Sequence, residues 1–396
     1  MLRAVNQIAQ ISLLNLRNLP ARAGSSLVAV IGIAGVVAIL VAVLSIAAGF
    51  RETIASTGAA DRAVVLRQGS TSEMVSFVGG DSARLIKNAP GVRFVDGTAL
   101  ASAELFVIVD LPKLPAGTPA NVPLRGVEPA AFAIRKELKM VEGRPFRTGT
   151  RELIAGKSAA LSFAGLEVGS TLRLAGNDWQ VVGIFETGGT LTESELWCDA
   201  RVLQPTYRRG NSFQAIYVQL ESEAALAKYR WTLDNDPRLD VAVERESDYY
   251  AGQSQVLTDL ITSLGLVIGI IMGAGAAFGA LNTMYTAVSS RTREIATLRA
   301  VGFQRLPIVV SVMVEAVVLG LVGGAIGAAA AWWMFDGFRT STMNWQSFSQ
   351  VAFAFRVTPD LLVLAVAYAL VLGLIGGILP AIKAARLPVA TALREL

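Results

Sequence analysis

The sequence has no histidine and a single cysteine, Cys198, among its 396 residues. The missing histidine excludes imidazole acid–base catalysis, serine–histidine or cysteine–histidine nucleophiles, and histidine metal sites. One cysteine cannot form a disulfide within the chain, and we interpret Cys198 as a small buried side chain. No spacing of acidic residues fits a metal cage. We therefore expect no catalytic, cofactor-binding or metal site in this chain.

The chain also has little charge. Charged residues make up 17% and hydrophobic residues 53%, with a mean hydropathy of +0.51. Soluble domains carry about 25% charge, so the composition favours a membrane protein. Four runs almost free of charge each exceed the roughly 20 residues that cross a bilayer. They are residues 23–50, 260–290, 306–335 and 361–382.

Two of these runs have further features. The first is too long for a signal peptide and follows 22 residues, so we interpret it as an uncleaved anchor. The second, at about 1.5 Å per residue, would reach ~46 Å, more than the ~30 Å hydrocarbon core. We expect this second helix to project beyond the membrane on at least one side.

Charge on the connecting segments predicts the orientation. Residues 1–22, 289–306 and 383–396 together carry ten bases and two acids, whereas residues 51–259 carry 23 bases and 26 acids. Basic residues collect on the cytoplasmic side of membrane proteins. We therefore expect both termini and residues 289–306 in the cytoplasm, and residues 51–259 outside.

The outer segment alternates strand and helix patterns. Two β-α-β stretches, around residues 62–110 and 213–246, predict an α+β sandwich of the split βαβ kind. Residues 126–211 between them indicate an inserted second subdomain, whose hairpin turns at Gly176-Asn177. Gly156–Ser158 spells GKS, but a phosphate-binding loop needs a glycine where Arg151 stands, so nucleotide binding there is rejected.

Glycines recur every fourth residue in three of the four runs. Small residues at this spacing let helix backbones approach closely in lipid. We predict a compact and dimeric helix bundle. The glycines expected to pack it are Gly265, Gly269, Gly273, Gly320, Gly324, Gly373 and Gly377.

Glu315 is the one ionisable residue in the third run. Such a group costs about 2.5–3.5 kcal/mol at the centre of a membrane helix. It could make a buried polar contact that changes partners during a working cycle. It could instead make a fixed contact to an interfacial arginine, such as Arg17 or Arg22, or to helix N–H groups.

The stretch SSRTREIATLRAVGFQRLP, residues 289–307, lies between the second and third runs. Its pattern predicts a helix over residues 291–301, with Gly302 as its stop and Pro307 opening the next span. The expected apolar side is Ile295, Leu298 and Val301, with Phe303 just past the end. The expected charged side is Arg291, Glu294 and Arg299. Lipid phosphates could hold such a helix, or a groove in a cytoplasmic protein could seat it.

Residues 289–327 resemble the signature of the FtsX-like/MacB-like permeases of ABC transporters. The matching elements are RTREI at 291–295, LRAVG at 298–302, the acid Glu315 and the glycine pair 323–324. The tail LPAIKAARLPVATALREL is similar to the family's ending, and GSTLRLAGNDWQVVGIFE at 169–186 resembles the outer domain of its MacB-like branch. With the one-plus-three order of spans, the resemblance covers most of the chain.

The resemblance implies a permease that dimerises with an identical or paralogous partner and binds two copies of an ABC ATPase. Residues 291–305 would be the coupling helix seated on that ATPase, which would hold ATP and Mg. The family residues for this role are Arg291, Arg293, Glu294, Ile295, Leu298, Arg299 and Gly302. ATP-driven closure would then move the outer domain, a mechanism of mechanotransmission, and the permease itself would not be an enzyme.

The resemblance also implies a layout in the bacterial inner membrane. Residues 1–22 would form an interfacial amphipathic helix, 336–360 a short periplasmic loop and 383–396 a cytoplasmic tail. The periplasmic domain would have a porter-like part, residues 51–125 and 212–259, and a sabre-like part, residues 126–211. Since only 22 residues precede the first span, we expect the ATPase on a separate polypeptide.

Four functions remain open at this point. The first is efflux or export with a periplasmic adaptor and an outer-membrane channel, and the second is lipoprotein release to a carrier. The third is transmission of a signal across the membrane to a cell-wall hydrolase, although the outer segment is larger than a simple docking domain for a hydrolase needs. The fourth is a membrane receptor without an ATPase. Membrane lipid is an expected partner in each case, and nucleic acid is not.

Overall fold

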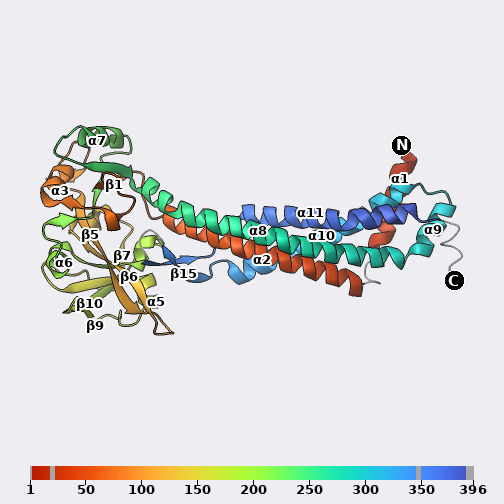
Figure 1. Ribbon diagram of the computed structural model, residues 1–396, viewed down its shortest axis with the longest axis horizontal. Helices are drawn as coiled ribbons and strands as arrows, with labels where there is room; N and C mark the ends of the chain where they lie inside the picture. The colour runs from red at the N-terminus through yellow and green to blue at the C-terminus, as the bar shows by residue number, and fades with distance from the viewer. Residues whose placement is uncertain (1, 18–22, 345–348, 389–396) are drawn as a thin grey trace. The chain divides into compact units, whose positions relative to one another are not determined.

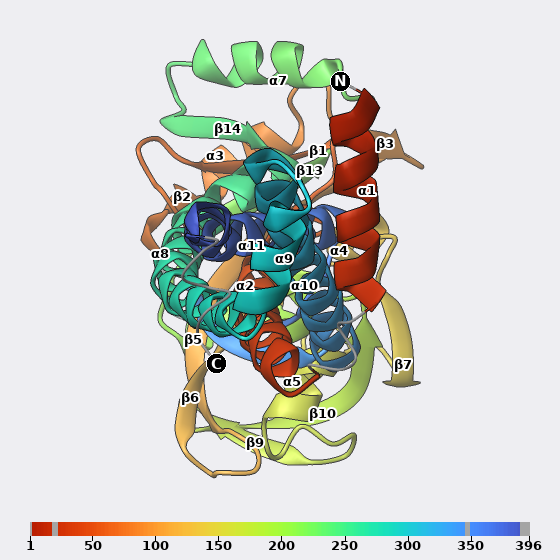
Figure 2. The same cartoon turned by 90° about the vertical axis from the view of Figure 1, so that its right-hand side faces the viewer.

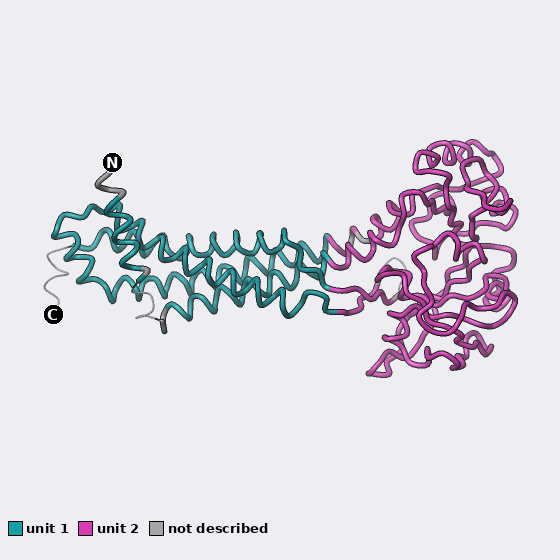
Figure 3. The backbone as a smooth tube through the Cα atoms, turned by 180° about the vertical axis from the view of Figure 1, so that it is seen from behind, with its two compact units in different colours: residues 1–48, 259–338, 355–396 teal, residues 49–258, 339–354 magenta. Residues whose placement is uncertain are grey.

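The structure is a computed structural model that describes residues 2–17, 23–344 and 349–388. The chain divides into two compact units (Figure 3). Unit 1 contains residues 1–48, 259–338 and 355–396, and unit 2 contains residues 49–258 and 339–354. The predicted basic residue Arg22 and the end of the tail, residues 389–396, lie outside the described residues.

Unit 1 is built from long helices that run side by side (Figures 1 and 2). Its helices, two of which continue into unit 2, are α1 (Leu2–Arg17), α2 (Ala23–Ala55), α8 (Glu246–Ser289), α9 (Thr292–Ala300), α10 (Arg305–Phe335) and α11 (Pro359–Arg386). Within the described residues, α2, α8, α10 and α11 are the four helices long and apolar enough to cross a membrane. The four predicted spans are therefore confirmed as helices.

Helix α8 begins earlier than predicted. It starts at Glu246 and has 44 residues, which corresponds to about 66 Å. The apolar run that predicted it stops at Asp259, but the polar residues before Asp259 continue the same helix. Helix α11 starts at a regular N-cap, where the Thr358 hydroxyl accepts a hydrogen bond from the Leu361 N–H, and Pro359 follows at the first helical position.

The seven predicted glycines all lie at contacts between helices of this same chain. A Cβ atom at Gly320 would stand 2.8 Å from the carbonyl oxygen of Ala369, so α10 and α11 can approach this closely only at glycine. The neighbours they face are Val43 for Gly265, Leu40 for Gly269, Tyr368 for Gly273, Ala369 for Gly320 and Gly324, and Ala316 for Gly373 and Gly377. The dimer stays a prediction, because these contacts are within one chain.

Unit 2 contains a ten-stranded mixed sheet in the order β14-β1-β13-β5-β6-β11-β8-β10-β7, with β9 paired to β10. The pairs β6–β11 and β8–β10 are parallel and the others are antiparallel. The strands are β1 (Arg62–Arg67), β5 (Ala101–Pro112), β6 (Pro119–Val127), β7 (Lys139–Gly143), β8 (Glu152–Gly156), β9 (Thr171–Leu174), β10 (Asn177–Glu186), β11 (Leu196–Asp199), β13 (Ala215–Gln219) and β14 (Val241–Arg245).

Shorter elements connect these strands. The helices are η2 (Glu73–Val75), α3 (Gly80–Lys87), α4 (Ala130–Ile134), α5 (Lys157–Ser162), η3 (Leu191–Ser194), α6 (Ala200–Thr206) and α7 (Ala225–Asp234). The remaining strands of this region are β2 (Val78–Gly79), β3 (Phe94–Val95), β4 (Thr98–Ala99) and β12 (Ser212–Phe213).

One half of the sheet has the predicted split βαβ arrangement. Along the chain its main elements are β1, α3, β5, β13, α7 and β14, and the strands lie in the order β14-β1-β13-β5. Val65 and Val218 from the strands share a core with Ile86 of α3 and with Tyr229 of α7. These side chains are buried because each helix turns its apolar face to the sheet.

The second half shares strands with the first, which differs from the predicted subdomain boundary at residue 126. Strand β5 pairs with β13 over residues 101–104 and then with β6 over residues 105–112. Leu105 and Leu124 consequently lie in a core with Leu153 and Trp179. The hairpin between β9 and β10 turns at Ala175-Gly176, both with positive φ, one residue before the predicted turn.

The predicted loop 336–360 contains a β-hairpin that belongs to unit 2. Its strands are β15 (Arg339–Asn344) and β16 (Ser349–Ala354). The Ala352 N–H donates to the Ser194 hydroxyl over 3.0 Å, and the ring of Phe353 lies 5.6 Å from that of Phe50. These contacts tie a segment from late in the sequence into a domain formed mainly by earlier residues.

Candidate coupling site

Helix α9 is short and ends in a well-formed glycine cap. Gly302 adopts φ +104°, its N–H donates to the carbonyl of Arg299, and the Phe303 N–H donates to the carbonyl of Leu298. This pair of hydrogen bonds is the Schellman motif, which needs the left-handed conformation that glycine adopts without strain. The motif reverses the chain, so that α10 starts only five residues after α9 ends.

The inner face of α9 is fixed to the bundle. Ile295 is 6% exposed and packs in a core with Met284, Val288 and Ile308. The guanidinium of Arg299 donates to the carbonyls of Ala385 and Leu387 at 3.0 and 2.9 Å, near the end of α11. Helix α9 is therefore held by apolar packing and by hydrogen bonds to another helix end.

A buried ion pair forms the third attachment. Nη2 of Arg291, at the N-cap of α9, lies 2.5 Å from Oε1 of Glu315 in α10, and both side chains are at most 5% exposed. The partner of Glu315 is thus Arg291, whereas the sequence suggested Arg17, which is exposed, or Arg22. The reason is the tight reversal after α9, which brings the N-cap residue of α9 beside the third turn of α10.

The outer face of α9 is mainly polar. Arg293, Glu294 and Thr297 are exposed, and Val301 at the C-cap is 75% exposed. This differs from the predicted faces, because Ile295 and Arg291 point into the bundle and Leu298 and Arg299 are half-buried. Ile295 belongs to the chain's own core, so a partner would meet the exposed residues Arg293, Glu294, Thr297 and Val301.

A cavity of about 380 Å³ lies beside α9 within unit 1, and the exposed residues Glu294 and Thr297 of α9 form part of its lining. Helices α1, α8, α9 and α10 contribute its walls, and Figure 2 shows α1 beside α10 at this end of the bundle. We call it the α9 cavity. Its polar lining residues are Asn15, Arg291, Glu294, Thr297, Ser311 and Glu315. Asn15 donates to the Ser311 hydroxyl over 3.3 Å and so links α1 to α10.

Comparison with protein families gives two consecutive matches. Residues 26–233, more than half of the chain, match the MacB-like periplasmic core domain, and residues 261–389 match the FtsX-like permease C-terminal domain.

The chain belongs to the MacB/FtsX-like permease family.

Individual relatives agree with this MacB/FtsX-like assignment. The macrolide export ATP-binding/permease protein MacB of Chromobacterium violaceum is 34% identical over 34% of this chain and 20% of its own length. MacB of Hahella chejuensis is 25% identical over 84% of this chain and 55% of its own. The ABC transporter permease YknZ of Bacillus subtilis is 25% identical over 57% of each. The chain thus spans between a fifth and somewhat over half of these relatives.

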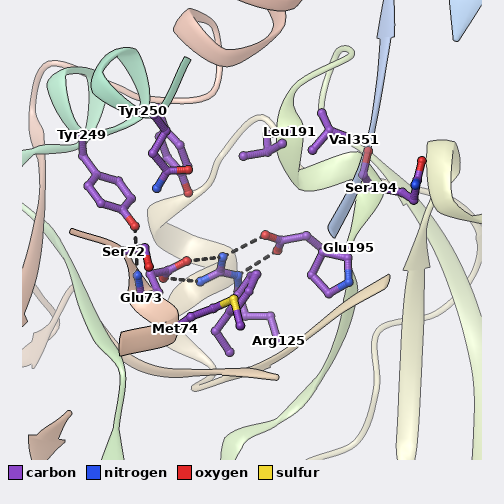
Figure 4. A pocket seen from close by; sticks show the side chains of 14 residues that line it. Ser72, Glu73, Met74, Arg125, Leu191, Ser194, Glu195, Tyr249, Tyr250 and Val351 are labelled. Atoms are coloured by element: carbon purple, nitrogen blue, oxygen red, sulfur yellow. Dashed lines mark hydrogen bonds and ion pairs between the residues drawn. The ribbon is translucent and has the colours of Figure 1, made fainter. Parts of the chain in front are cut away.

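The MacB-like periplasmic core domain holds a buried group of charges that the sequence analysis missed. We call it the Arg125 cluster: Arg125, Arg135, Glu73, Glu104, Glu195 and Tyr217. Arg125 bonds Glu73 at 2.7 and 2.9 Å, Glu195 at 2.8 Å through two nitrogens, and Glu104 at 3.1 Å. Figure 4 shows Glu73 and Glu195 converging on Arg125 from two sides.

Further contacts complete the Arg125 cluster. Arg135 bonds the carboxylate of Glu104 at 2.7 and 3.0 Å, and the Tyr217 hydroxyl donates to Glu73 over 2.9 Å. Burial opposes the charge on Arg125, but the carboxylates of Glu195 and Glu73 outweigh it and raise the pKa of Arg125 well above its ordinary value. Arg125 therefore stays positively charged inside the cluster although it is buried.

The geometry gives this cluster a structural role, in which it holds several elements of the MacB-like domain together. The cavity beside Arg125 in Figure 4 has about 20 Å³, room for one water molecule and no larger ligand. Its members come from β5, β6, β13, the C-cap of α4, η2 and the segment after η3. A sequence signal did exist: single charges, such as Glu104 in ASAELFVIV, interrupt strands that are otherwise apolar.

Proposed function

We propose that the chain is the permease subunit of an exporting ABC transporter in a bacterial inner membrane. An ATPase on a second polypeptide binds the outer face of α9 in the cytoplasm, and two permeases and two ATPase subunits form the assembly. The observation that carries the proposal is the attachment of α9 to the bundle at three places while Arg293, Thr297 and Val301 face outward.

Force applied to the outer face of α9 reaches the bundle through rigid contacts. The Arg291–Glu315 pair passes it to α10, and the Arg299 contacts pass it to the end of α11. Helices α2 and α8 continue from unit 1 into unit 2 without interruption, so they carry the movement to the periplasmic domain. In this mechanism the mechanical work of the ATPase is transmitted across the membrane, and the cargo does not need to pass through the permease.

Export is the function that we propose for this movement, together with a periplasmic adaptor and an outer-membrane channel. The names of two relatives above, both MacB proteins, describe macrolide export. A strain lacking the chain is expected to become more sensitive to hydrophobic toxic compounds. If that strain instead accumulated lipoproteins in its inner membrane at unchanged drug sensitivity, lipoprotein release would replace export.

Substitutions on the outer face of α9 test the coupling. Arg293→Glu and Val301→Asp are each expected to reduce capture of the ATPase by about tenfold or more, because they place repulsive or desolvated charge at the contact. Capture is measured by co-purification of an ABC ATPase with the tagged chain from its native host, and by stimulation of ATP hydrolysis in the purified complex. Glu142→Lys, a charge reversal on exposed β7, is the control. Unchanged capture by both α9 variants would contradict the proposal.

Cysteine labelling tests the orientation. In a Cys198→Ala background, Trp231→Cys is expected to react with a membrane-impermeant maleimide in intact cells, since Trp231 is 68% exposed in unit 2. Arg293→Cys is expected to react only after the inner membrane is permeabilised. Equal labelling of both positions in intact cells would overturn the cytoplasmic placement of α9.

A further inference from the structure

The end of α10 carries a group of exposed apolar side chains. They are Trp332, Trp333, Met334 and Phe338, which are 53%, 81%, 59% and 55% exposed, and we call them the α10 belt. Successive helix residues point about 100° apart, so Trp332, Trp333 and Met334 cover roughly 200° of the helix surface. Ala331, which is fully buried, marks the side of α10 that packs in the bundle. An apolar patch as exposed as this indicates a surface that meets a partner or a membrane.

The connection between α10 and α11 holds the α10 belt in place. The Gly337 N–H donates to the carbonyl of Phe355 over 3.0 Å, and the Phe355 N–H donates to the carbonyl of Phe338 over 2.9 Å. The rings of Phe338 and Phe355 meet edge-on at 5.5 Å, and the carboxylate of Asp336 accepts the N–H of Val357 over 3.0 Å. The exposure of the belt is therefore built into the fold at the point where α10 ends and α11 begins.

The length of α10 matches the distance between two lipid headgroup layers. Arg305, which is exposed, opens α10, and Trp332 follows 27 residues later, about 40 Å along the helix axis. A bilayer with its headgroup regions is about 40–45 Å thick. Tryptophan collects at such interfaces, because its ring is apolar and its N–H is polar. The position of the belt at the far end of α10 is thus that of an interfacial anchor.

We propose that the α10 belt binds the headgroup boundary of the lipid bilayer and fixes the depth of the four spans. The indole N–H groups of Trp332 and Trp333 donate to lipid ester or phosphate oxygens, and their rings and the Met334 side chain lie against the outermost part of the acyl chains. This inference needs neither an ATPase nor a cargo, nor does it depend on which side of the membrane holds α9. It therefore stands apart from the proposed function.

The depth of the belt determines where the other helices leave the lipid. The carbonyl of Ser45 in α2 accepts the N–H of Arg356 over 3.1 Å, so Ser45 lies level with the connection between α10 and α11. Gly265 of α8 faces Leu44 at nearly the same level. The part of α8 before Gly265, the 19 residues 246–264, consequently lies beyond the acyl chains and reaches about 28 Å from them.

Quenching of tryptophan fluorescence by brominated lipids tests the belt. The full chain is reconstituted into phosphatidylcholine vesicles that carry bromine either near the headgroup end or near the methyl end of the acyl chain. Trp345, which lies outside the described residues, is replaced by phenylalanine in every sample. Bromine near the headgroup end is expected to quench more strongly, because the indoles lie at that depth.

Two results of this measurement would overturn the proposal. Stronger quenching by bromine near the methyl end would place the belt in the interior of the bilayer. The absence of quenching by both lipids would show that protein, such as a second copy of the chain, covers the belt.

Matched variants assign the quenched signal to the belt. The double variant Trp332→Phe/Trp333→Phe keeps apolar rings on α10 and is expected to lose the quenching by lipid. Trp231→Phe, which removes an exposed indole of unit 2, is the control and is expected to keep it. Trp179 and Trp197 are fully buried in unit 2 and contribute emission that lipid does not reach. Quenching that persists in the double variant would contradict the assignment.

Cysteine labelling tests the depth that follows for α8. The experiment uses membranes opened on both sides and a Cys198→Ala background. Gln255→Cys is expected to react with a charged maleimide, because Gln255 is exposed and lies ten residues, about 15 Å, beyond Gly265. Ile270→Cys is the control and is expected not to react, since Ile270 is 70% exposed on the part of α8 that faces acyl chains. Equal reaction at the two positions would overturn the level assigned to the belt.

Discussion

Replacing Arg125 with alanine is expected to lower the free energy of unfolding of unit 2 by about 3–5 kcal/mol. The substitution removes the cation that bonds Glu73, Glu104 and Glu195. It leaves Glu73 and Glu195 without a cation in an interior where Arg125 itself is only 2% exposed, whereas Glu104 keeps Arg135. An ion left buried without its partner costs far more than the pair itself contributes.

Pulse proteolysis of the full chain in urea measures this loss in unit 2. Arg144→Ala is the matched control, because Arg144 makes a comparable 2.7 Å ion pair with Glu152 but is 41% exposed, and it should change stability much less. A second substitution, Glu73→Gln, should restore part of the stability of Arg125→Ala by removing one uncompensated charge. An Arg125→Ala protein as stable as the Arg144→Ala protein would contradict the structural role of the Arg125 cluster.

Gly320→Leu is expected to give the second large effect, a destabilisation of the helix bundle by about 1–3 kcal/mol or more. The first side-chain carbon would stand 2.8 Å from the carbonyl oxygen of Ala369 and 3.2 Å from Cα of Gly373, both backbone atoms of α11. Backbone cannot rotate away as a side chain can, so α10 and α11 must separate along their shared contact.

The midpoint temperature of thermal unfolding measures this effect. The purified chain is heated in detergent, and the folded fraction that remains at each temperature is measured by size-exclusion chromatography. Gly275→Leu is the matched control, since an added Cβ at Gly275 has no atom within 4 Å. The control makes the same change in hydrophobicity and helix propensity without the collision. Equal midpoints for the two variants would show that the approach of α10 and α11 does not depend on glycine.

The sequence could predict the features that a local pattern encodes. Long apolar runs define membrane-length helices because the bilayer fixes their length, and Gly302 follows the last turn of α9 because the cap needs positive φ. The split βαβ half of unit 2 was also predictable, since strand and helix patterns alternate there. In each case a few neighbouring residues determine the outcome.

The features that the sequence could not predict depend on contacts between distant segments. The Arg125 cluster joins residues from 73 to 217, and no periodicity reports that five charged side chains meet. The direction in which α9 turns its apolar face could not be predicted from the sequence either, because a short amphipathic helix can pack against its own bundle or against a partner protein. In the structure Ile295 packs in the core of the chain's own helix bundle, and in this orientation of α9 Arg291 lies beside Glu315.

The hairpin of β15 and β16 has a consequence for biogenesis. Residues 339–354 leave the ribosome after α8 and α10 have been synthesised, yet they complete the domain that begins at residue 49. Until then the ring of Phe50 and the hydroxyl of Ser194 lack the partners that β16 provides. The domain therefore reaches its final fold only late in translation, and a truncated chain that stops before residue 339 would present an unfinished surface to quality-control proteases.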